Sequence, residues 1–197
     1  IPQSTTLAVS QADKILLNNP SFDALPEKAR NTIKFWDNLG PENQSPPDIQ
    51  PGQYAVITKP SHGNQYLGMV VRETGTREAI GQKLPAILAK KTAYSFQLWM
   101  ARSEDYTSMT RVGERSFSTP AVLQIWGFNT QTSKKVLLAK SDPVAHENWR
   151  QYDFTLMSPE FDVDYIILEA WFDLKNNKAY NGNILIDNCS AIVRLNK

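Results

Sequence analysis

Short apolar stretches separated by turn signals fill most of the chain after residue 53, and this pattern constrains the fold more than any other feature. Turn residues such as His62-Gly63-Asn64 and Asn176-Asn177 interrupt these stretches. Many short strands at this spacing are typical of an antiparallel sandwich or barrel, not of alternating strands and helices. The predicted strands are Tyr54–Thr58, Gln65–Arg72, Glu78–Leu84, Ala93–Arg102, Ala121–Phe128, Lys135–Lys140, Arg150–Leu156 and Tyr165–Phe172.

Two further apolar stretches lie at the two ends of this pattern. Residues 15–17 form the first predicted strand, and residues 180–193 form the last, entered through the Asn-Gly turn signal at 181–182. If these two strands pair, they close a single β-sandwich. Asp187 lies inside the last strand, where an unpaired buried charge would be costly, so we expect it to face water or to pair with a cation.

The segments outside the strands have three characters. Residues 1–14 are polar and are interpreted as a lead-in to a single domain over 15–197. Residues 26–39 begin with proline and carry apolar residues near helical spacing, which predicts one short helix at the rim. The proline-rich residues 40–53 and the polar residues 103–120 are predicted loops, and the second is long enough to suggest a functional or partner-facing role.

Bulk composition excludes several classes of function. The 197 residues carry 21 basic and 20 acidic side chains, a net charge of +1, so nothing indicates a nucleic-acid surface. The single cysteine, Cys189, excludes an internal disulfide and a cysteine-based metal site. No apolar run approaches the roughly 20 residues that a membrane span needs. The sequence begins at Ile1, which we interpret as a processed form whose signal peptide is gone, secreted or held in the periplasm or cell envelope.

Two predicted strands carry polar and aromatic residues on the side opposite their apolar positions. Gln97 and Trp99 alternate on one strand, and Gln124 and Trp126 on another. A flat ring covers the apolar face of a sugar while amides serve its hydroxyls, so these four residues predict a sugar-binding face.

Three further residues are candidates at the edge of that face. Arg72 and Arg102 each end a strand and either clamp a polar ligand or form ion pairs with Glu78 or Glu104. Tyr106, in the long loop, is a candidate rim contact.

Catalytic chemistry finds little support in the sequence. Glu78 and Glu169 are acids of the kind that glycoside hydrolysis needs in pairs, but neither lies in a catalytic motif, and we interpret them as members of ion pairs. His62 and His146 are the only histidines and provide too few ligands for a catalytic metal. We therefore predict a protein that is not an enzyme.

A series of short motifs in a fixed order resembles a known family. Seven such motifs run from Asn19-Pro-Ser-Phe-Asp23 through Ser61-His62-Gly63 to Ile186-Asp187-Asn188; the other four are Ile80-Gly-Gln-Lys-Leu84, Ala93-Tyr-Ser-Phe96, Asn148-Trp-Arg-Gln-Tyr152 and Ile167-Leu-Glu169. Together they resemble the galactose-binding-like carbohydrate-binding modules of the family 4/9/22 type. The resemblance implies an all-β, antiparallel jelly-roll β-sandwich over about residues 15–195.

The resemblance also implies a structural calcium ion where the terminal strands meet. In this chain it would be held by Asp23, Asp187 and backbone carbonyls near Gly63 or Asn64, and hard oxygen ligands of this kind suit calcium. The family usually has glutamate at the position of Asp23, so the shorter aspartate is a departure from its pattern.

A second set of motifs looks like jelly-roll proteins of the Bacteroidetes-type cell envelope, some of which are linked to type IX secretion. The motifs are Tyr66-Leu-Gly-Met-Val-Val-Arg72, Arg102-Ser-Glu-Asp-Tyr106, Leu138-Ala-Lys-Ser141 and Tyr180-Asn-Gly-Asn183. Two functions therefore stay open. One is a non-catalytic module that binds a polysaccharide or envelope glycan, and the other is an envelope protein–protein adaptor that contacts its partner through residues 40–53 and 103–120.

Overall fold

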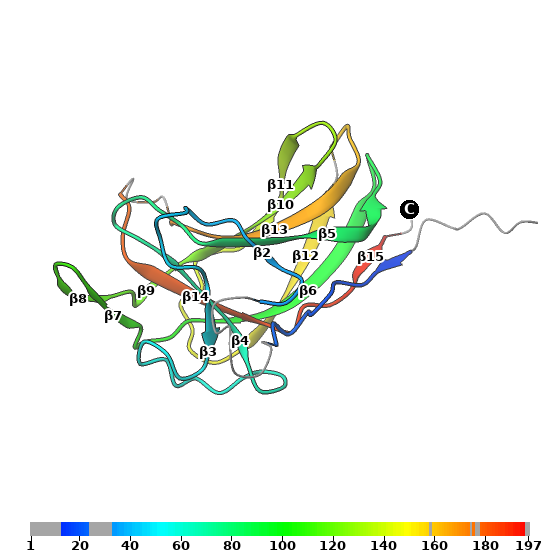
Figure 1. The fold of residues 1–197 in the computed structure, drawn as a ribbon. Coiled ribbons are helices and arrows are strands. Elements are labelled where there is room, and N and C mark those ends of the chain that lie inside the picture. The colour runs from blue at the N-terminus through cyan, green and yellow to red at the C-terminus, as the bar shows by residue number, and fades with distance from the viewer. Residues whose placement is uncertain (1–12, 24–32, 158, 174, 176–177, 196–197) are drawn as a thin grey trace, which may run out of the picture.

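The computed structural model describes residues 13–23, 33–157, 159–173, 175 and 178–195 as a protein built from strands. Figure 1 shows two large sheets stacked on each other and a small hairpin that projects from one end. The strands are β1 (Lys14–Ile15), β2 (Asp37–Asn38), β3 (Asp48–Gln50), β4 (Tyr66–Val71), β5 (Ala79–Leu88), β6 (Ala93–Ala101), β7 (Thr107–Thr110), β8 (Gly113–Ser116), β9 (Thr119–Pro120), β10 (Val122–Asn129), β11 (Lys134–Lys140), β12 (Arg150–Met157), β13 (Val163–Trp171), β14 (Gly182–Asp187) and β15 (Ile192–Arg194).

The two large sheets differ in strand content. One has eight strands: β1, β15, β6, β14, β4 and β3 in this order, with β12 also paired to β6 and β9 to β14. The other has five strands in the order β11-β10-β13-β5-β2. Nearly all pairings are antiparallel, the parallel contact of β9 with β14 being the exception among the described pairs. The predicted antiparallel jelly-roll sandwich is confirmed.

One hydrophobic core fills the space between the two sheets. On β6 the inward side chains are those at alternate positions from Tyr94 to Met100, and on β10 they include Leu123 and Ile125. Successive side chains of a strand point to opposite faces of the sheet, so the residues between these inward positions point outward. Each large sheet therefore has a core face and an outer face.

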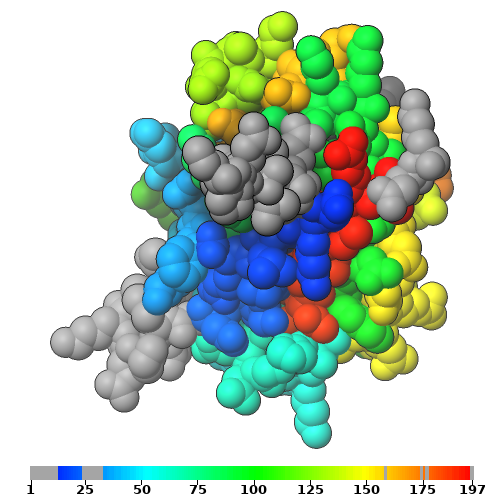
Figure 2. Space-filling model, turned by 90° about the vertical axis from the view of Figure 1, so that its right-hand side faces the viewer, coloured from blue at the N-terminus to red at the C-terminus, as the bar shows by residue number. Residues whose placement is uncertain are grey.

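The terminal strands meet as predicted. Lys14 of β1 pairs with Val193 of β15, and Ile15 pairs with Ile192. Figure 2 shows the blue N-terminal strand lying beside the red C-terminal one. The pairing adds β1 to the eight-stranded sheet, so the first and last described strands lie side by side at one edge of that sheet.

Several local predictions need correction. The predicted helix over 26–39 falls partly outside the described residues, and over 33–39 it is wrong, because Asp37 and Asn38 form β2 at the edge of the five-stranded sheet. Residues 54–58 form a turn and an irregular segment instead of a strand, and the predicted 103–120 loop contains the β7–β8 hairpin. Of the lead-in, residues 1–12 lie outside the described residues. Among the residues that are described, no helix has the length and apolar character needed to span a membrane.

Candidate functional site

The four residues of the predicted sugar-binding face do not share a face. Gln97 and Trp99 lie on the outer face of the eight-stranded sheet, because their neighbours on β6 point into the core. Gln124 and Trp126 lie on the outer face of the five-stranded sheet, on the opposite side of the sandwich. The prediction of one shared face is therefore wrong, since parity within each strand carries no information about which sheet the strand joins.

The surroundings of Trp99 offer little to a ligand beyond its own ring. Gln97 is exposed and donates a hydrogen bond to Asp153 on β12. Across the strands, Trp99 pairs with Gln151 and with Asp187. Both paired positions are polar, so the half-buried Trp99 ring has no second aromatic ring at the positions paired with it.

The outer face of the five-stranded sheet is richer in aromatic residues. Trp126 and Trp171 have ring centroids 6.3 Å apart, and so do Phe128 and Tyr165. All four rings are half-buried and come from β10 and β13, which are hydrogen-bonded neighbours. Gln124 and Glu169 are directly paired across the same two strands. We define the aromatic face as these six residues: Gln124, Trp126, Phe128, Tyr165, Glu169 and Trp171.

Polar atoms on the aromatic face lack hydrogen-bond partners. Within the described residues, Gln124 Oε1, Trp126 Nε1 and Glu169 Oε2 are buried and accept or donate no hydrogen bond. Glu169 Oε1 accepts from Arg77 Nε at 3.2 Å, whereas Lys135 Nζ lies 3.9 Å from Oε2, an ion pair too long for a hydrogen bond. Buried polar groups normally have partners, so these atoms suit a ligand that supplies them.

Two cations cover the indole rings. Lys135 Nζ lies 4.3 Å from the centroid of the Trp126 ring, and the Arg77 guanidinium lies 3.8 Å from that of Trp171. The Lys135 side chain is 44% exposed, so it can leave Trp126 at small cost when a ligand stacks there. Arg77 is held more firmly, by Glu169 and by the carbonyl of Gly75.

The other predicted ligand residues lie elsewhere. Arg72 is buried and forms an ion pair with Glu78, as one of its two predicted roles required. Arg102 pairs with Glu147 at 3.2 Å, not with Glu104, and donates to the carbonyl of Ser118 at 2.7 Å. These arginines therefore do not reach the aromatic face.

Tyr106, the candidate rim contact in the predicted loop, packs inside a second apolar cluster beside Tyr66, Val70 and Phe117. Its side chain is buried and its hydroxyl donates a hydrogen bond to the Asp48 carboxylate. Burial raises the pKa of Asp48 to about 6, although the bond from Tyr106 opposes this effect. Tyr54 stacks on the Tyr106 ring at 6.0 Å between centroids.

The predicted cation site is built around the turn at residues 61–63. Asp187 is fully buried and, contrary to expectation, does not face water: its carboxylate accepts from the backbone N–H groups of His62 and Asn188, both at 2.7 Å. Asp23 is exposed, and its Oδ1 lies 3.7 Å from the position that a Cβ on Gly63 would take. Two carboxylates therefore border one turn.

The donor set at this turn fits a hard cation in part. Among the described residues no group of three or more aspartate, glutamate, histidine or cysteine side chains gathers. Calcium takes six to eight oxygen ligands, so an ion between Asp23 and Asp187 would need carbonyls near Gly63 and Asn64 and several waters.

Four residues of the aromatic face and one at its border were not among the predicted ligand-binding residues: Phe128, Tyr165, Glu169, Trp171 and Arg77. The available signal was the alternation of Tyr165, Glu169 and Trp171 along a single strand, which places them on one side of it. They lie beside Trp126 only because β10 pairs with β13, and the local sequence pattern does not show which strands pair.

Comparison with known proteins supports the fold. No protein-family model matches the chain, and no curated protein matches it in sequence. The structure of a Stig cyclase, Fisc, from Fischerella sp. TAU aligns over 93% of this chain and 98% of its own, with a TM-score of 0.58 and 11% identity. An arabinose-bound α-L-arabinofuranosidase, MgGH51, aligns over 92% of this chain and 26% of its own, with a TM-score of 0.52 and 12% identity. The CBM22-1–GH10 modules of xylanase 10B from Clostridium thermocellum reach a TM-score of 0.48 at 14% identity over 83% of this chain and 26% of theirs. At such identities the likeness to the cyclase and to the arabinofuranosidase indicates the sandwich fold alone.

Proposed function

We propose that this domain binds carbohydrate without catalysis, through the aromatic face of the five-stranded sheet. The observation that carries the proposal is the set of unpartnered polar atoms beside half-buried rings on β10 and β13. Rings cover the apolar faces of sugars, and amide and carboxylate oxygens accept hydrogen bonds from hydroxyls. Gln124 Oε1 and Glu169 Oε2 are the acceptors on this face, and Trp126 Nε1 is the donor.

Lys135 controls access to this face in the proposal. A sugar that stacks on Trp126 takes the place of the Lys135 ammonium group, which now lies over the ring. The displaced ammonium remains close enough to Glu169 to keep its ion pair or to contact the ligand. The neighbours that share the fold hold different ligands, arabinose in the α-L-arabinofuranosidase structure and an indole compound in the cyclase structure. Carbohydrate is the ligand class to test first because of the unpartnered acceptors beside the rings of this face.

Removing the Trp126 ring is expected to weaken glycan binding by at least about tenfold, since the apolar surface that a sugar and an aromatic ring bury on stacking contributes more than about 1.4 kcal/mol. Affinity electrophoresis and titration calorimetry with xylan, galactan, mannan and arabinan measure the effect in Trp126→Ala. Trp99→Ala, on the opposite face of the sandwich, is the matched control and should bind as the wild type does. Equal losses in both variants, or a loss only in Trp99→Ala, would contradict the proposed face.

A protein partner replaces the glycan in the second candidate function, the envelope adaptor. The β7–β8 hairpin favours it, because Met109 and Val112 are 75% and 74% exposed at its tip. If the domain retains none of the glycans, the adaptor function becomes the favoured one. The exported or envelope location and the Bacteroidetes-type kinship stay predictions.

A calcium ion at the 61–63 turn completes the proposal. It would join Asp23 to the Asp187 carboxylate and so tie the N-terminal segment to β14. A ligand bound only by the folded state raises the melting temperature by mass action. We expect excess EDTA to lower the melting temperature and calcium to restore it, and Asp23→Asn to abolish the response. An unchanged melting curve in EDTA and in calcium would rule out the ion.

A further inference from the structure

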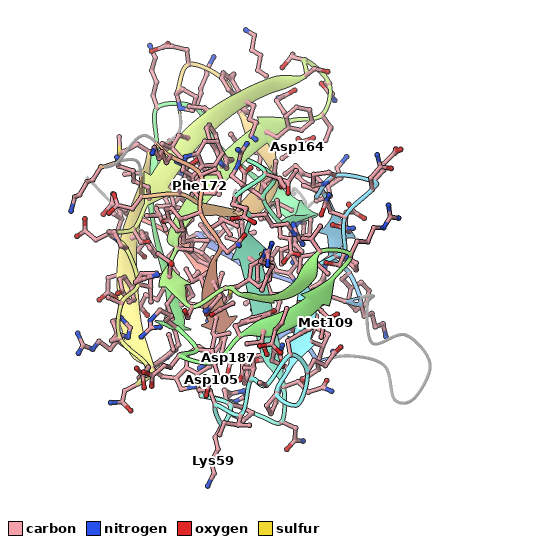
Figure 3. All side chains as sticks on the ribbon, turned by 90° about the vertical axis from the view of Figure 1, so that its left-hand side faces the viewer. Lys59, Asp105, Met109, Asp164, Phe172 and Asp187 are labelled. Atoms are coloured by element: carbon pink, nitrogen blue, oxygen red, sulfur yellow. The ribbon has the colours of Figure 1, made fainter. Side chains whose placement is uncertain are left out.

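A cavity of about 840 Å³ lies on the far side of the molecule from the aromatic face, over β4 of the eight-stranded sheet. Residues 43–45, Asp48 and Tyr54 form one side, and the β7–β8 hairpin forms the other. Figure 3 shows this hairpin crossing the front of the molecule, with Met109 labelled on it. The two segments predicted as functional loops thus meet around one cavity, whose size is typical of small-molecule sites.

The cavity walls are fixed by buried contacts. The Asn183 side chain on β14 donates to the carbonyls of Ser103 and Phe117, both at 2.8 Å, and accepts from Ser103 N–H at 2.9 Å. These bonds hold both ends of the hairpin segment against the sheet. Tyr106 then bonds to Asp48 on the opposite wall, so the cavity is preformed.

One buried donor at the cavity wall has no partner. Arg72 is only 9% exposed, its Nη2 donates to Ser45 Oγ at 3.0 Å and to Glu78, and its Nη1 is buried without a hydrogen bond to any described residue. A guanidinium donor in such a position is costly unless something accepts from it. Arg72 lines the cavity, so an acceptor atom on a ligand would satisfy Nη1.

The charges around the cavity argue against an anionic ligand. Arg72 is balanced by Glu78, and Arg115 lies 3.5 Å from Glu73. The Asp48 carboxylate lines the same cavity and would repel an anion. Arg111 is the lining cation for which the described residues provide no ion pair.

The remaining wall is suited to a polyhydroxyl molecule. Tyr54 and Phe117 offer apolar surface, while Ser108 and Thr110 offer hydroxyl groups. An acceptor, Asp48, and a donor, Arg72, line the same space and match the paired donor and acceptor character of sugar hydroxyls.

We propose that this cavity is a second ligand site, which takes a neutral sugar of one or two units between Arg72, Asp48 and the rings of Tyr54 and Phe117. The site shares no residue with the aromatic face, so either site can fail without the other.

The test is saturation-transfer NMR on the full domain with glucose, galactose, mannose, xylose, lactose and maltose, followed by titration of the sugar that gives the strongest signal. Ser108→Trp fills the cavity, whereas Met109→Trp places the same ring on the exposed side of the same strand. We expect binding at least about tenfold weaker in Ser108→Trp and unchanged in Met109→Trp and in Trp126→Ala. Asp48→Asn, which keeps the shape of the cavity, should weaken binding by about tenfold as well, because it removes a charged acceptor.

Three results would overturn the proposal. One is no signal from any of the neutral sugars in the wild type. Another is equal binding by Asp48→Asn and the wild type, which remains decisive if Ser108→Trp does not fold. The third is tighter binding of galacturonate than of galactose, which would make the cavity an anion site. Loss of glycan binding in Trp126→Ala with an intact cavity signal separates the two sites.

Discussion

Asn183→Ala is expected to lower the free energy of unfolding by about 3–5 kcal/mol, because three buried backbone groups lose their partner at once. The Asn183 side chain is fully buried and serves the N–H and carbonyl of Ser103 and the carbonyl of Phe117. Each group would be left in the interior without a hydrogen bond. Urea denaturation at pH 7 measures the change.

Asn181→Ala is the matched control for Asn183→Ala. Asn181 lies two residues away and its side chain accepts one exposed hydrogen bond, from Glu73 N–H at 2.9 Å. A loss below about 1 kcal/mol is expected there. Similar losses in the two variants would contradict the role of Asn183 as the group that fastens the hairpin segment to β14.

Asp48→Asn is expected to raise the free energy of unfolding by about 3 kcal/mol at pH 8, since a pKa raised from 3.8 to about 6 corresponds to about 1.4 kcal/mol per pKa unit. Burial disfavours the charged carboxylate, so the ionised group destabilises the folded state above pH 6. As the pH falls through 6, the folded protein takes up a proton before the unfolded chain does, and the wild type gains stability. The advantage of the variant should therefore shrink below pH 6 and vanish below 3.8.

Denaturation curves for both proteins between pH 8 and pH 3.5 test this pH dependence. The Tyr106 hydroxyl can still donate to the amide carbonyl of the variant, so the bond to β3 is kept. Asp142→Asn, at an exposed position, should change stability by less than about 0.5 kcal/mol at every pH. A constant difference across the range, or a less stable Asp48→Asn at pH 8, would contradict the burial argument.

A carboxylate that destabilises its own fold invites a functional explanation. Asp48 is expected to lower stability while it provides the charged acceptor of the proposed cavity site. Asp48→Asn should thus be more stable and bind sugar less well, the exchange of stability for function that is common at binding sites.

The sequence was most informative where local pattern decides the structure. The alternation of apolar positions along residues 94–100 and 122–128 predicted the strands β6 and β10 and the side chains that enter the core. The pairing of the terminal strands was also predicted from the similar character of residues 15–17 and 180–193. The first of these features depends on residues adjacent in the chain, and the second on the need of the first and last strands for a pairing partner.

The candidate site depends on contacts that the sequence does not display. Trp99 and Trp126 carry the same local pattern, yet the strand pairings put them on opposite sides of the sandwich. The cavity likewise requires Tyr106 to meet Asp48 across 58 positions of chain. Asp187 was expected to face water or to pair with a cation, and the sequence did not show that its carboxylate accepts a hydrogen bond from His62 N–H, 125 positions away, as well as one from the adjacent Asn188 N–H.

A nitrogen–proton correlation NMR titration tests glycan binding on the aromatic face most directly. The indole N–H signals of the five tryptophans report separate places: Trp36 and Trp149 donate to the backbone carbonyls of Asn19 and Lys59 and serve as references. On titration with xylohexaose, β-1,4-galactotriose and mannohexaose, we expect at least one to shift the signals of Trp126 and Trp171 and to leave that of Trp99 in place. A shift confined to Trp99, or no indole shift with any of the three, would contradict the assignment of the aromatic face as the glycan site.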